Sequence, residues 1–475
     1  MANEEGVSAP DLAALLTSMK AAQLKDGIPG AKERIRRLDA LDRAVVDHKD
    51  AIARAMSEDF GNKARAEALV SEVFLVADAA RHARAHLREW MEPEAREVPW
   101  SLMPAQAEIV PQPVGVVGIV APWNYPINLS LIPLVGALAA GCRAIIKPSE
   151  LVPKTSRLLA DIVRSAFDPS VVTVVEGDAS VGEAFTKLPF DHLVFTGSTR
   201  VGHVVMRAAS ENLVPVTLEL GGKSPVVLGS DVDVKEAAKL ILAGKIWNAG
   251  QTCIAPDYVL APRALMDKLV DAAKAAMPGF LTRLADNADY TSIVSDRHYA
   301  RLTGLVADAK DKGARVEVLN PANEELSAAS RKLAPTLIVD ANETMTVMQE
   351  EIFGPILPIV AADTLDDAIK FVNDRPRPLA LYFFGRKSAE IDKVIESTRS
   401  GGVTINDTLL HAATDDLPFG GVGASGMGAY HGKEGFETFT LRRPIFIQSR
   451  LSGRRLLAPP FGKMLDGLLK VLIGR

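Results

Sequence analysis

Apolar residues recur at helical spacing in the chain up to Trp90. The segment Leu12–Met19 places them three and four residues apart, with Asp11 near its start, and it predicts an amphipathic helix with an acid in its first turn. The segments 35–52 and 66–90 have the same period and predict two further helices. No catalytic group of residues stands out here, so we interpret this region as a structural scaffold.

From about Ile109, short β-rich runs alternate with helical ones. Such alternation predicts an open parallel sheet with helices on both faces, which binds ligands outside the carboxyl ends of its strands. The first region has predicted strands at 114–120, 144–147, 171–175 and 192–196, and predicted helices at 128–140, 156–167, 181–187 and 200–210. A second α/β region from Pro225 has predicted helices at 237–246 and 264–276, and predicted strands at 258–261, 334–338, 357–360 and 379–384.

Two other apolar stretches raise the question of a membrane. The run Leu129–Ile146 is broken by glycine, proline and polar residues, so it predicts a helix, a turn and a strand rather than a membrane span. In the tail, 451–475, apolar residues from Phe461 to Ile473 follow helical spacing. We interpret the tail as a helix that docks on its own subunit or on a partner, with an interfacial membrane anchor or a lid as the alternative.

Composition narrows the class of protein. A length of 475 residues with 48% hydrophobic and 24% charged residues fits an ordinary globular protein of about two to four domains. The net charge of −5 gives no reason to expect a nucleic-acid partner. Two cysteines and an N-terminus unlike a signal peptide fit a reducing compartment, and we expect the cytoplasm.

One of the two cysteines is a candidate nucleophile. Cys253 follows Ala249 and Gly250, where the backbone can come close to whatever the sulfur attacks. A thiolate becomes reactive when its pKa is lowered or a base lies nearby, and Glu219, in a strand-like run that ends at Gly-Gly, is the candidate base. By itself a single cysteine is more often an inert buried thiol, which is how we interpret Cys142.

Polar side chains follow two of the predicted strands. Asn124, in Ala121-Pro-Trp-Asn-Tyr-Pro126, can offer its amide N–H to a developing oxyanion, or it can merely satisfy the turn that the prolines impose. Lys147 and Glu150 follow the strand at 144–147. They can hold the hydroxyls of a ribose, and the alternative is a solvated loop pair.

Two further stretches are candidates for cofactor contacts. Gly197, Ser198 and Gly202 join a predicted strand to a helix, and Ser198 can donate to a phosphate at the helix N-terminus or act as an ordinary cap. Glu351 and Phe353 place an acid beside an aromatic ring, which can face a sugar and a nicotinamide. The histidines are scattered without a metal-binding spacing, so we predict no metal site.

Together these motifs resemble the aldehyde dehydrogenase superfamily over essentially the whole chain. The resemblance rests on Pro122-Trp-Asn-Tyr-Pro126, Lys147-Pro-Ser-Glu150, Phe195-Thr-Gly-Ser198, Leu218-Glu-Leu-Gly-Gly-Lys-Ser-Pro225, Gly250-Gln-Thr-Cys253 and Glu350-Glu-Ile-Phe-Gly-Pro355. The segment 417–432 is similar to the class 3 branch. The stretches 90–93, 212–215, 255–258 and 289–293 are similar to the bacterial coniferyl aldehyde dehydrogenases within it.

The resemblance implies an α/β fold of two open parallel domains and a small β oligomerisation element. The expected dinucleotide-binding domain is 1–94 and 116–218, and the expected catalytic domain is 219–436. Bridging strands are expected at 95–115 and 437–450, and the tail helix at 451–475. A class 3 protein is expected to be a homodimer, bridged by a hairpin near 95–115 and a strand near 437–448.

The resemblance also implies roles for individual residues. Cys253 attacks the aldehyde carbon, Asn124 and the Cys253 backbone N–H hold the oxyanion, and a hydride leaves for a nicotinamide. Glu219 then acts as general base for hydrolysis of the thioester. The adenosine ribose is assigned to Lys147 and Glu150, the pyrophosphate to Ser198, and the nicotinamide end to Glu351 and Phe353. Glu150 favours NAD, because a 2′-phosphate would meet its charge, and NADP is the alternative.

The substrate is expected to be an aromatic aldehyde such as coniferaldehyde. Tyr125, Asn128 and Trp247 are placed near its channel, where an aromatic ring can stack. The alternative is a medium- or long-chain aliphatic aldehyde, perhaps at a membrane. A thiol-dependent hydrolase would not need the cofactor residues, an acyl transfer to CoA would not need Glu219 as water-activating base, and a non-catalytic role would not need these reactive positions.

Overall fold

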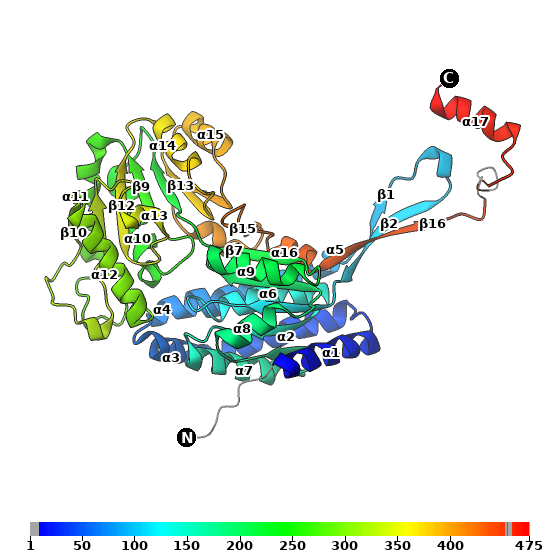
Figure 1. Cartoon of the computed structure of the whole chain (residues 1–475), viewed down its shortest axis with the longest axis horizontal. Coiled ribbons are helices and arrows are strands. Elements are labelled where there is room, and N and C mark those ends of the chain that lie inside the picture. Colours follow the sequence, from blue (N-terminus) through cyan, green and yellow to red (C-terminus); the bar gives the residue numbers. More distant parts are fainter. Residues whose placement is uncertain (1–8, 452–453, 455–457, 475) are drawn as a thin grey trace.

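Three β-sheets organise the chain in the computed structural model, which describes residues 9–451, 454 and 458–474. Two sheets form the body, and the third projects from it with the last helix at its far end (Figure 1). The predicted α/β fold is confirmed. The N-terminal residues that were compared with a signal peptide, and part of the predicted tail, lie outside the described residues.

The first sheet has the strand order β15-β7-β6-β3-β4-β5. Its strands are parallel except for β15, which pairs antiparallel with β7. The chain passes from β3 outward to β5 and then returns to β6 on the other side of β3, so the strand order reverses between β3 and β6, where such sheets bind ligands. The strands are β3 (Val116–Val120), β4 (Arg143–Lys147), β5 (Val172–Val174), β6 (His192–Gly197), β7 (Val216–Leu220) and β15 (Gly426–Met427).

Helices cover both faces of this sheet. One face shares a hydrophobic cluster with α1, α8 and α9, and the other with α2, α5, α6 and α7. Every residue of α6 is buried, which explains why its sequence is apolar all round. The helices are α1 (Ala9–Asp26), α2 (Ala31–Asp47), α3 (Lys49–Phe60), α4 (Arg65–Ala68), the π-helical η1 (Leu69–Phe74), α5 (Leu75–Trp90), α6 (Asn128–Ala140), α7 (Pro153–Ala166), α8 (Ala179–Thr186) and α9 (Thr199–Ser210).

The second sheet has the order β10-β11-β12-β9-β8-β13-β14, with β10 antiparallel and the others parallel. Its strands are β8 (Pro225–Leu228), β9 (Tyr258–Ala261), β10 (Arg315–Val318), β11 (Thr336–Val339), β12 (Ile356–Ala361), β13 (Ala380–Phe384) and β14 (Gly402–Ile405). Its helices are α10 (Val234–Ile246), η3 (Trp247–Gly250), α11 (Arg263–Phe280), α12 (Asp296–Asp311), η4 (Ala328–Ser330), α13 (Thr346–Gln349), α14 (Leu365–Asn373), α15 (Ser388–Ser397) and η5 (Leu410–Ala413).

Two sequence expectations need correction. The predicted helix 35–52 is two helices, α2 and α3, because the chain bends at His48, whose ring Nδ1 contacts the Ala44 carbonyl oxygen at 2.7 Å. Residues 426–436, assigned by sequence to the catalytic domain, lie with the first sheet. There β15 pairs with β7, and α16 (Gly432–Thr438) packs on α6.

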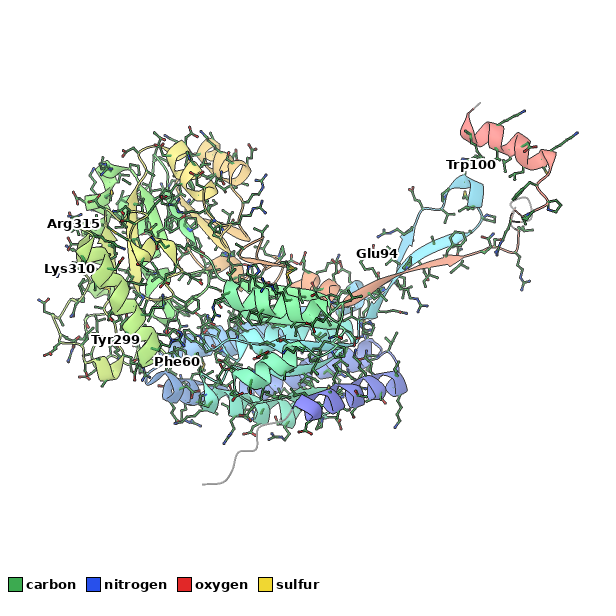
Figure 2. The ribbon with its side chains drawn as sticks, viewed as in Figure 1. Phe60, Glu94, Trp100, Tyr299, Lys310 and Arg315 are labelled. Carbon is green, nitrogen blue, oxygen red and sulfur yellow. The ribbon has the colours of Figure 1, made fainter. Side chains whose placement is uncertain are left out.

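The third sheet is a projecting ribbon in the antiparallel order β1-β2-β16. Glu94 and Trp100 lie along it in Figure 2, and the Glu94 carboxylate pairs with the Arg442 guanidinium at 2.7 Å. Of the residues described in α17, only Leu465 is buried, so the tail helix does not dock on the body of its own chain. The elements are β1 (Glu94–Arg96), η2 (Trp100–Leu102), β2 (Gln106–Pro113), β16 (Thr440–Ile447) and α17 (Lys463–Ile473).

Candidate active site

The cysteine loop follows α10 through a turn of left-handed backbone. Asn248, Ala249 and Gly250 have φ values of 52°, 50° and 71°. At Gly250 a Cβ would lie 2.3 Å from the Gly354 carbonyl oxygen, so this position requires glycine. The backbone that lies against Gly250 is that of Gly354, which is one residue beyond Phe353.

The electrostatics around Cys253 keep its thiol protonated in this state. Burial, followed by the negative charges of Glu351 and Glu219, raises the pKa of Cys253 to about 12. Hydrogen bonds from the backbone N–H groups of Cys253 and Ile254 act in the opposite direction, because they stabilise a thiolate. The nucleophile therefore needs a base or a change in the surrounding charge before it can attack.

Glu219 lies at the carboxyl end of β7 and is 2% exposed. Neither of its carboxylate oxygens has a hydrogen-bond partner among the described residues, and burial raises its pKa well above the usual range. The Tyr430 hydroxyl is also buried without a partner there, and burial raises its pKa, with the charges of Glu219 and Cys253 adding to the shift. A carboxylate held this way is a stronger base than one in water.

Asn124 lies in the loop between β3 and α6, buried beside the cysteine loop. Its side-chain Nδ2 donates to the Gln251 carbonyl oxygen at 3.2 Å, which leaves the second amide N–H for a ligand. The next residue, Tyr125, forms a 2.6 Å hydrogen bond between its hydroxyl and the Thr252 Oγ1. The structure thus brings Asn124 and the segment just before Cys253 together.

Lys147 ends β4 and Glu150 lies in the loop that follows, next to the point where the strand order reverses. The buried Lys147 Nζ lies 3.7 Å from the exposed Glu150 carboxylate and donates to the Pro148 carbonyl oxygen at 2.7 Å. Burial lowers the pKa of Lys147, and Glu150 opposes that shift. This pair fits the hydroxyls of a ribose, because it offers a donor and an acceptor side by side.

The residues of the predicted phosphate-binding stretch, Gly197, Ser198 and Gly202, have two different roles. Ser198 is exposed and caps α9, where its hydroxyl accepts from the Val201 N–H at 3.4 Å. Gly197 ends β6 and Ser198 begins the turn into α9, so the two residues stand at a helix N-terminus of the kind that binds anions. Gly202 is buried instead: a Cβ there would lie 2.6 Å from the Leu220 side chain. We therefore assign Gly202 to helix–strand packing rather than to ligand contact.

Glu351 and Phe353 lie between the cysteine loop and the first sheet. A Cβ on Gly221 would meet the Glu351 Oε2 at 2.1 Å, so glycine makes room for this carboxylate. Burial raises the pKa of Glu351 to about 8, and its Oε1 has no partner among the described residues. The Phe353 ring stands edge-on to Trp123 at 5.4 Å between centroids. The unpartnered carboxylate oxygen fits the ribose hydroxyls of a dinucleotide.

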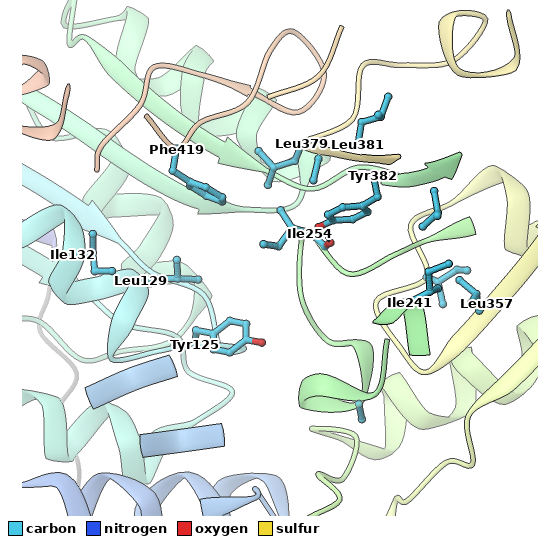
Figure 3. Packing of buried hydrophobic residues seen from close by; sticks show 14 of the residues in the cluster. Tyr125, Leu129, Ile132, Ile241, Ile254, Leu357, Leu379, Leu381, Tyr382 and Phe419 are labelled. Carbon is cyan, nitrogen blue, oxygen red and sulfur yellow. Dashed lines mark hydrogen bonds between the residues drawn. The ribbon is translucent and has the colours of Figure 1, made fainter. Parts of the chain in front are cut away.

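The three residues predicted for the substrate channel behave differently. Tyr125 contacts the cysteine loop and shares one hydrophobic cluster with Leu129 and Ile254 (Figure 3). Asn128 turns the other way, because its amide donates to the Ser71 carbonyl oxygen at 2.7 Å. Trp247 is half-buried and packs against the same cluster. Of the three, Tyr125 is the one tied to the cysteine loop by a hydrogen bond.

Sequence reasoning missed several residues around this loop. Gln251 is fully buried and ties the loop to Asn248, Ser292 and Val294 through its side-chain amide. Lys63 and Glu67 reach the loop from the N-terminal helices that we interpreted as scaffold. The only sequence signal for Lys63 and Glu67 was that charged residues stand among the apolar residues of a helical region. The sequence does not show which residues they contact.

Two features are absent from the described part of the chain. No group of three His, Cys, Asp or Glu side chains there is arranged to hold a metal ion. Among the same residues, no helix is both long and apolar enough to cross a membrane.

A doubly wound sheet beside a half-buried cysteine, a buried carboxylate and a buried amide is the arrangement expected of a cysteine-dependent dehydrogenase. The chain belongs to the aldehyde dehydrogenase family, whose model matches residues 6–445. It is similar to the probable coniferyl aldehyde dehydrogenase of Pseudomonas aeruginosa, with 47% identity over 98% of this chain and 96% of that protein. It is also similar to the coniferyl aldehyde dehydrogenase of a Pseudomonas species, with 46% identity over 99% and 98%.

Solved structures agree with this assignment. The substrate-bound state of Staphylococcus aureus AldH superimposes with a TM-score of 0.91 at 38% identity, covering 97% of this chain and 99% of the other. Mycobacterium tuberculosis aldehyde dehydrogenase, solved with NAD+, superimposes with a TM-score of 0.83 at 29% identity, covering 94% and 91%. The recognition of the family and the fold from sequence is thereby confirmed.

Proposed function

We propose that this enzyme oxidises an aromatic aldehyde of the coniferaldehyde type to its carboxylic acid, with NAD as the preferred cofactor and NADP as the alternative. The observation that carries the proposal is the convergence of Cys253, Asn124 and Glu219 where the two sheets meet. The near full-length similarity to two coniferyl aldehyde dehydrogenases supports the aromatic substrate.

The first chemical step forms a bond between the Cys253 sulfur and the aldehyde carbon. The sulfur gives up its proton to water and attacks as the thiolate, so that Glu219 is kept for the hydrolysis that follows. The carbonyl oxygen gains negative charge, and the free N–H of the Asn124 amide and the Cys253 backbone N–H are the candidate donors to it. These donors need little reorganisation, since Asn124 is already fixed by Gln251.

A bound NAD would supply the acceptor for the hydride that leaves the same carbon. Lys147 and Glu150 would hold its adenosine ribose, Ser198 at the start of α9 would hold the pyrophosphate, and Glu351 with Phe353 would hold the nicotinamide end. The unpartnered Glu351 Oε1 and the room left by Gly221 favour this assignment.

The second half of the reaction releases the acid from a thioester. Water attacks the acyl carbon, Glu219 takes a proton from that water, and the carbon–sulfur bond breaks to return Cys253. A carboxylate whose pKa is raised by burial is suited to this work at neutral pH. Glu219 thus favours the free acid as product.

The test is reduced-cofactor absorbance with NAD or NADP, comparing coniferaldehyde, benzaldehyde, hexanal and decanal, with Cys253→Ala as control. Faster turnover of coniferaldehyde with NAD, lost in Cys253→Ala, is the expected result. Faster turnover of decanal would replace the aromatic substrate with an aliphatic one. Ester hydrolysis without reduction of either cofactor would overturn the redox function.

A further inference from the structure

Lys63 is a buried charge next to the cysteine loop that the proposed chemistry does not use. It lies between α3 and α4, and its side chain is shielded from solvent. Its Nζ donates to the Asn248 Oδ1 at 2.5 Å and lies 3.9 Å from the Glu67 carboxylate. Burying an ammonium group is costly unless it is paired and hydrogen-bonded, so these contacts are what retain it.

The same ammonium lies over two aromatic rings. Its Nζ is 5.1 Å from the centre of the Tyr125 ring and 5.4 Å from that of Phe60, which ends α3. Cation–π contacts of this kind are stronger when the cation is desolvated. Figure 2 shows Phe60 on the side of the helical layer that faces the second sheet, so Lys63 bridges the two halves of the body.

The hydrogen bond from Lys63 determines which way the Asn248 amide faces. An ammonium group only donates, so it holds the Asn248 oxygen toward itself. The Nδ2 group then faces two carbonyl oxygens, those of Gln251 at 3.0 Å and of Asn124 at 3.3 Å. In the flipped orientation the Asn248 oxygen would face both carbonyl oxygens, and all of these bonds would be lost.

Both asparagine amides converge on a single acceptor. The Gln251 carbonyl oxygen accepts from Asn248 Nδ2 and also from Asn124 Nδ2 at 3.2 Å. A carbonyl oxygen has two lone pairs, so the two bonds are compatible and fix the plane of the Asn124 amide. The Asn248 backbone N–H donates to the Glu67 Oε1 at 2.9 Å. This hydrogen bond holds the left-handed turn before Cys253 in place.

We propose that Lys63 is a positioning residue for the oxyanion site, and that it acts through the amide of Asn248. It orients Asn248 so that this amide links the loop of Asn124 to the loop of Cys253. The N-terminal helical region thereby contributes to catalysis as well as to the scaffold. This inference rests on the proposed function of Asn124 and Cys253.

The test compares Lys63→Met with Asn248→Asp in the full-length enzyme. Methionine keeps the bulk of the side chain but donates no hydrogen bond. Aspartate keeps the partner of Lys63 but removes both amide donors, and it tolerates the left-handed backbone. We expect both variants to lower kcat by about 10- to 100-fold, the range that small misplacements of reacting groups produce, while the KM for NAD stays at the wild-type value.

Lys332→Met is the matched control, because Lys332 is also a buried lysine that donates to a backbone carbonyl, that of Asn287, away from the cysteine loop. Its kcat should stay within about twofold of wild type. Thermal unfolding is followed for all variants to separate lost stability from lost catalysis. Wild-type kcat in folded Lys63→Met or Asn248→Asp would overturn the inference, and so would an equal loss in Lys332→Met. Because Cys253→Ala tests the proposed function separately, failure of one claim does not remove the other.

Discussion

At the scale of single residues, burial sets the acid–base chemistry of the site. Removal from water raises the pKa of Cys253 to about 12 and that of Glu351 to about 8, and it raises that of Glu219 well above its usual range. All three shifts favour the neutral form. The site therefore favours a neutral thiol and neutral carboxyl groups, and Glu219 accepts a proton from water only in its ionised form.

The aromatic preference is expected to depend on Tyr125. Its ring lies over Lys63 and its hydroxyl is bonded to Thr252. We predict that Tyr125→Leu lowers the ratio of coniferaldehyde to hexanal kcat/KM by about 3- to 10-fold, because a ring pair contributes about 0.5–1.5 kcal/mol. The two kcat/KM values are measured side by side in the wild type and the variant. An unchanged ratio would remove Tyr125 from the specificity argument.

His431 is expected to make stability depend on pH. Burial lowers its pKa from 6.5 to about 4, so the unfolded chain binds a proton in this window that the folded chain does not. Stability present above pH 6.5 is then lost as the pH falls toward 4. His431→Phe keeps the ring between Phe419 and Tyr430 and should reduce the slope of unfolding free energy by about 1.4 kcal/mol per pH unit.

Urea unfolding at several pH values across this window measures the slope. His203→Phe, at an exposed position, controls for the removal of a surface imidazole. An acid slope in His431→Phe equal to that of the wild type would contradict the prediction.

How much of the site the sequence predicts depends on where each residue's partner comes from. Cys253, Asn124 and Lys147 stand next to strand ends or in distinctive motifs, so local pattern is enough to nominate them. Lys63 is different, because its proposed role depends on its contact with Asn248, which lies far along the chain. Asn128 was nominated because it follows Asn124 along the chain, but the backbone of α6 directs its amide to Ser71.

At the scale of elements, amphipathic or wholly buried segments were predictable. The helix Asn128–Ala140 and the strand Tyr258–Ala261 have the predicted bounds. The sequence pattern did not predict α12, α14 or α15, which mix apolar and charged residues, or the partly exposed strands β10 and β14. The π-helical turn η1 also gave no signal, because the apolar period continues through it into α5.

The π-helical turn supplies the N-terminal partner of α6. Its Glu72 Oε2 accepts from the backbone N–H groups of Ile127 at 3.0 Å and Asn128 at 2.8 Å. We predict that Glu72→Ala lowers the free energy of unfolding by about 2–3 kcal/mol, because two buried donors lose their acceptor. Glu72→Gln should cost about 1 kcal/mol, since its amide oxygen still accepts.

Urea unfolding at neutral pH compares the two variants, with Glu89→Ala at an exposed position of α5 as the control. Equal losses for Glu72→Ala and Glu72→Gln would show that the acceptor role is not what stabilises α6.

At the scale of the whole molecule, the projecting ribbon is the feature that the two-sheet body does not explain. In the described part of the chain, β16 pairs only with β2, so its other edge is unpaired. Phe446 and Ile447 on β16 are 52% and 47% exposed, and Trp100 near the end of the hairpin is 65% exposed. Unpaired strand edges and exposed apolar side chains are typical of surfaces that bind another chain. This agrees with the homodimer that we propose.

We predict that Phe446→Asp converts the homodimer to a monomer, because a charge would be buried at the interface. Size-exclusion chromatography with light scattering measures the mass in solution. Leu24→Asp, on the exposed side of α1, is the control and should leave the mass unchanged. A Phe446→Asp protein with the mass of the wild type would place the dimer contact elsewhere or exclude it.

The central claim is that oxidation proceeds through an acyl group on Cys253 that Glu219 then helps to remove. The most direct measurement is the intact mass of Glu219→Gln after rapid mixing with coniferaldehyde and NAD. We predict one acyl adduct per chain, absent from Cys253→Ala, with steady turnover reduced by about 100-fold or more. Wild-type turnover in Glu219→Gln, with no adduct on Cys253 at any time, would contradict the account.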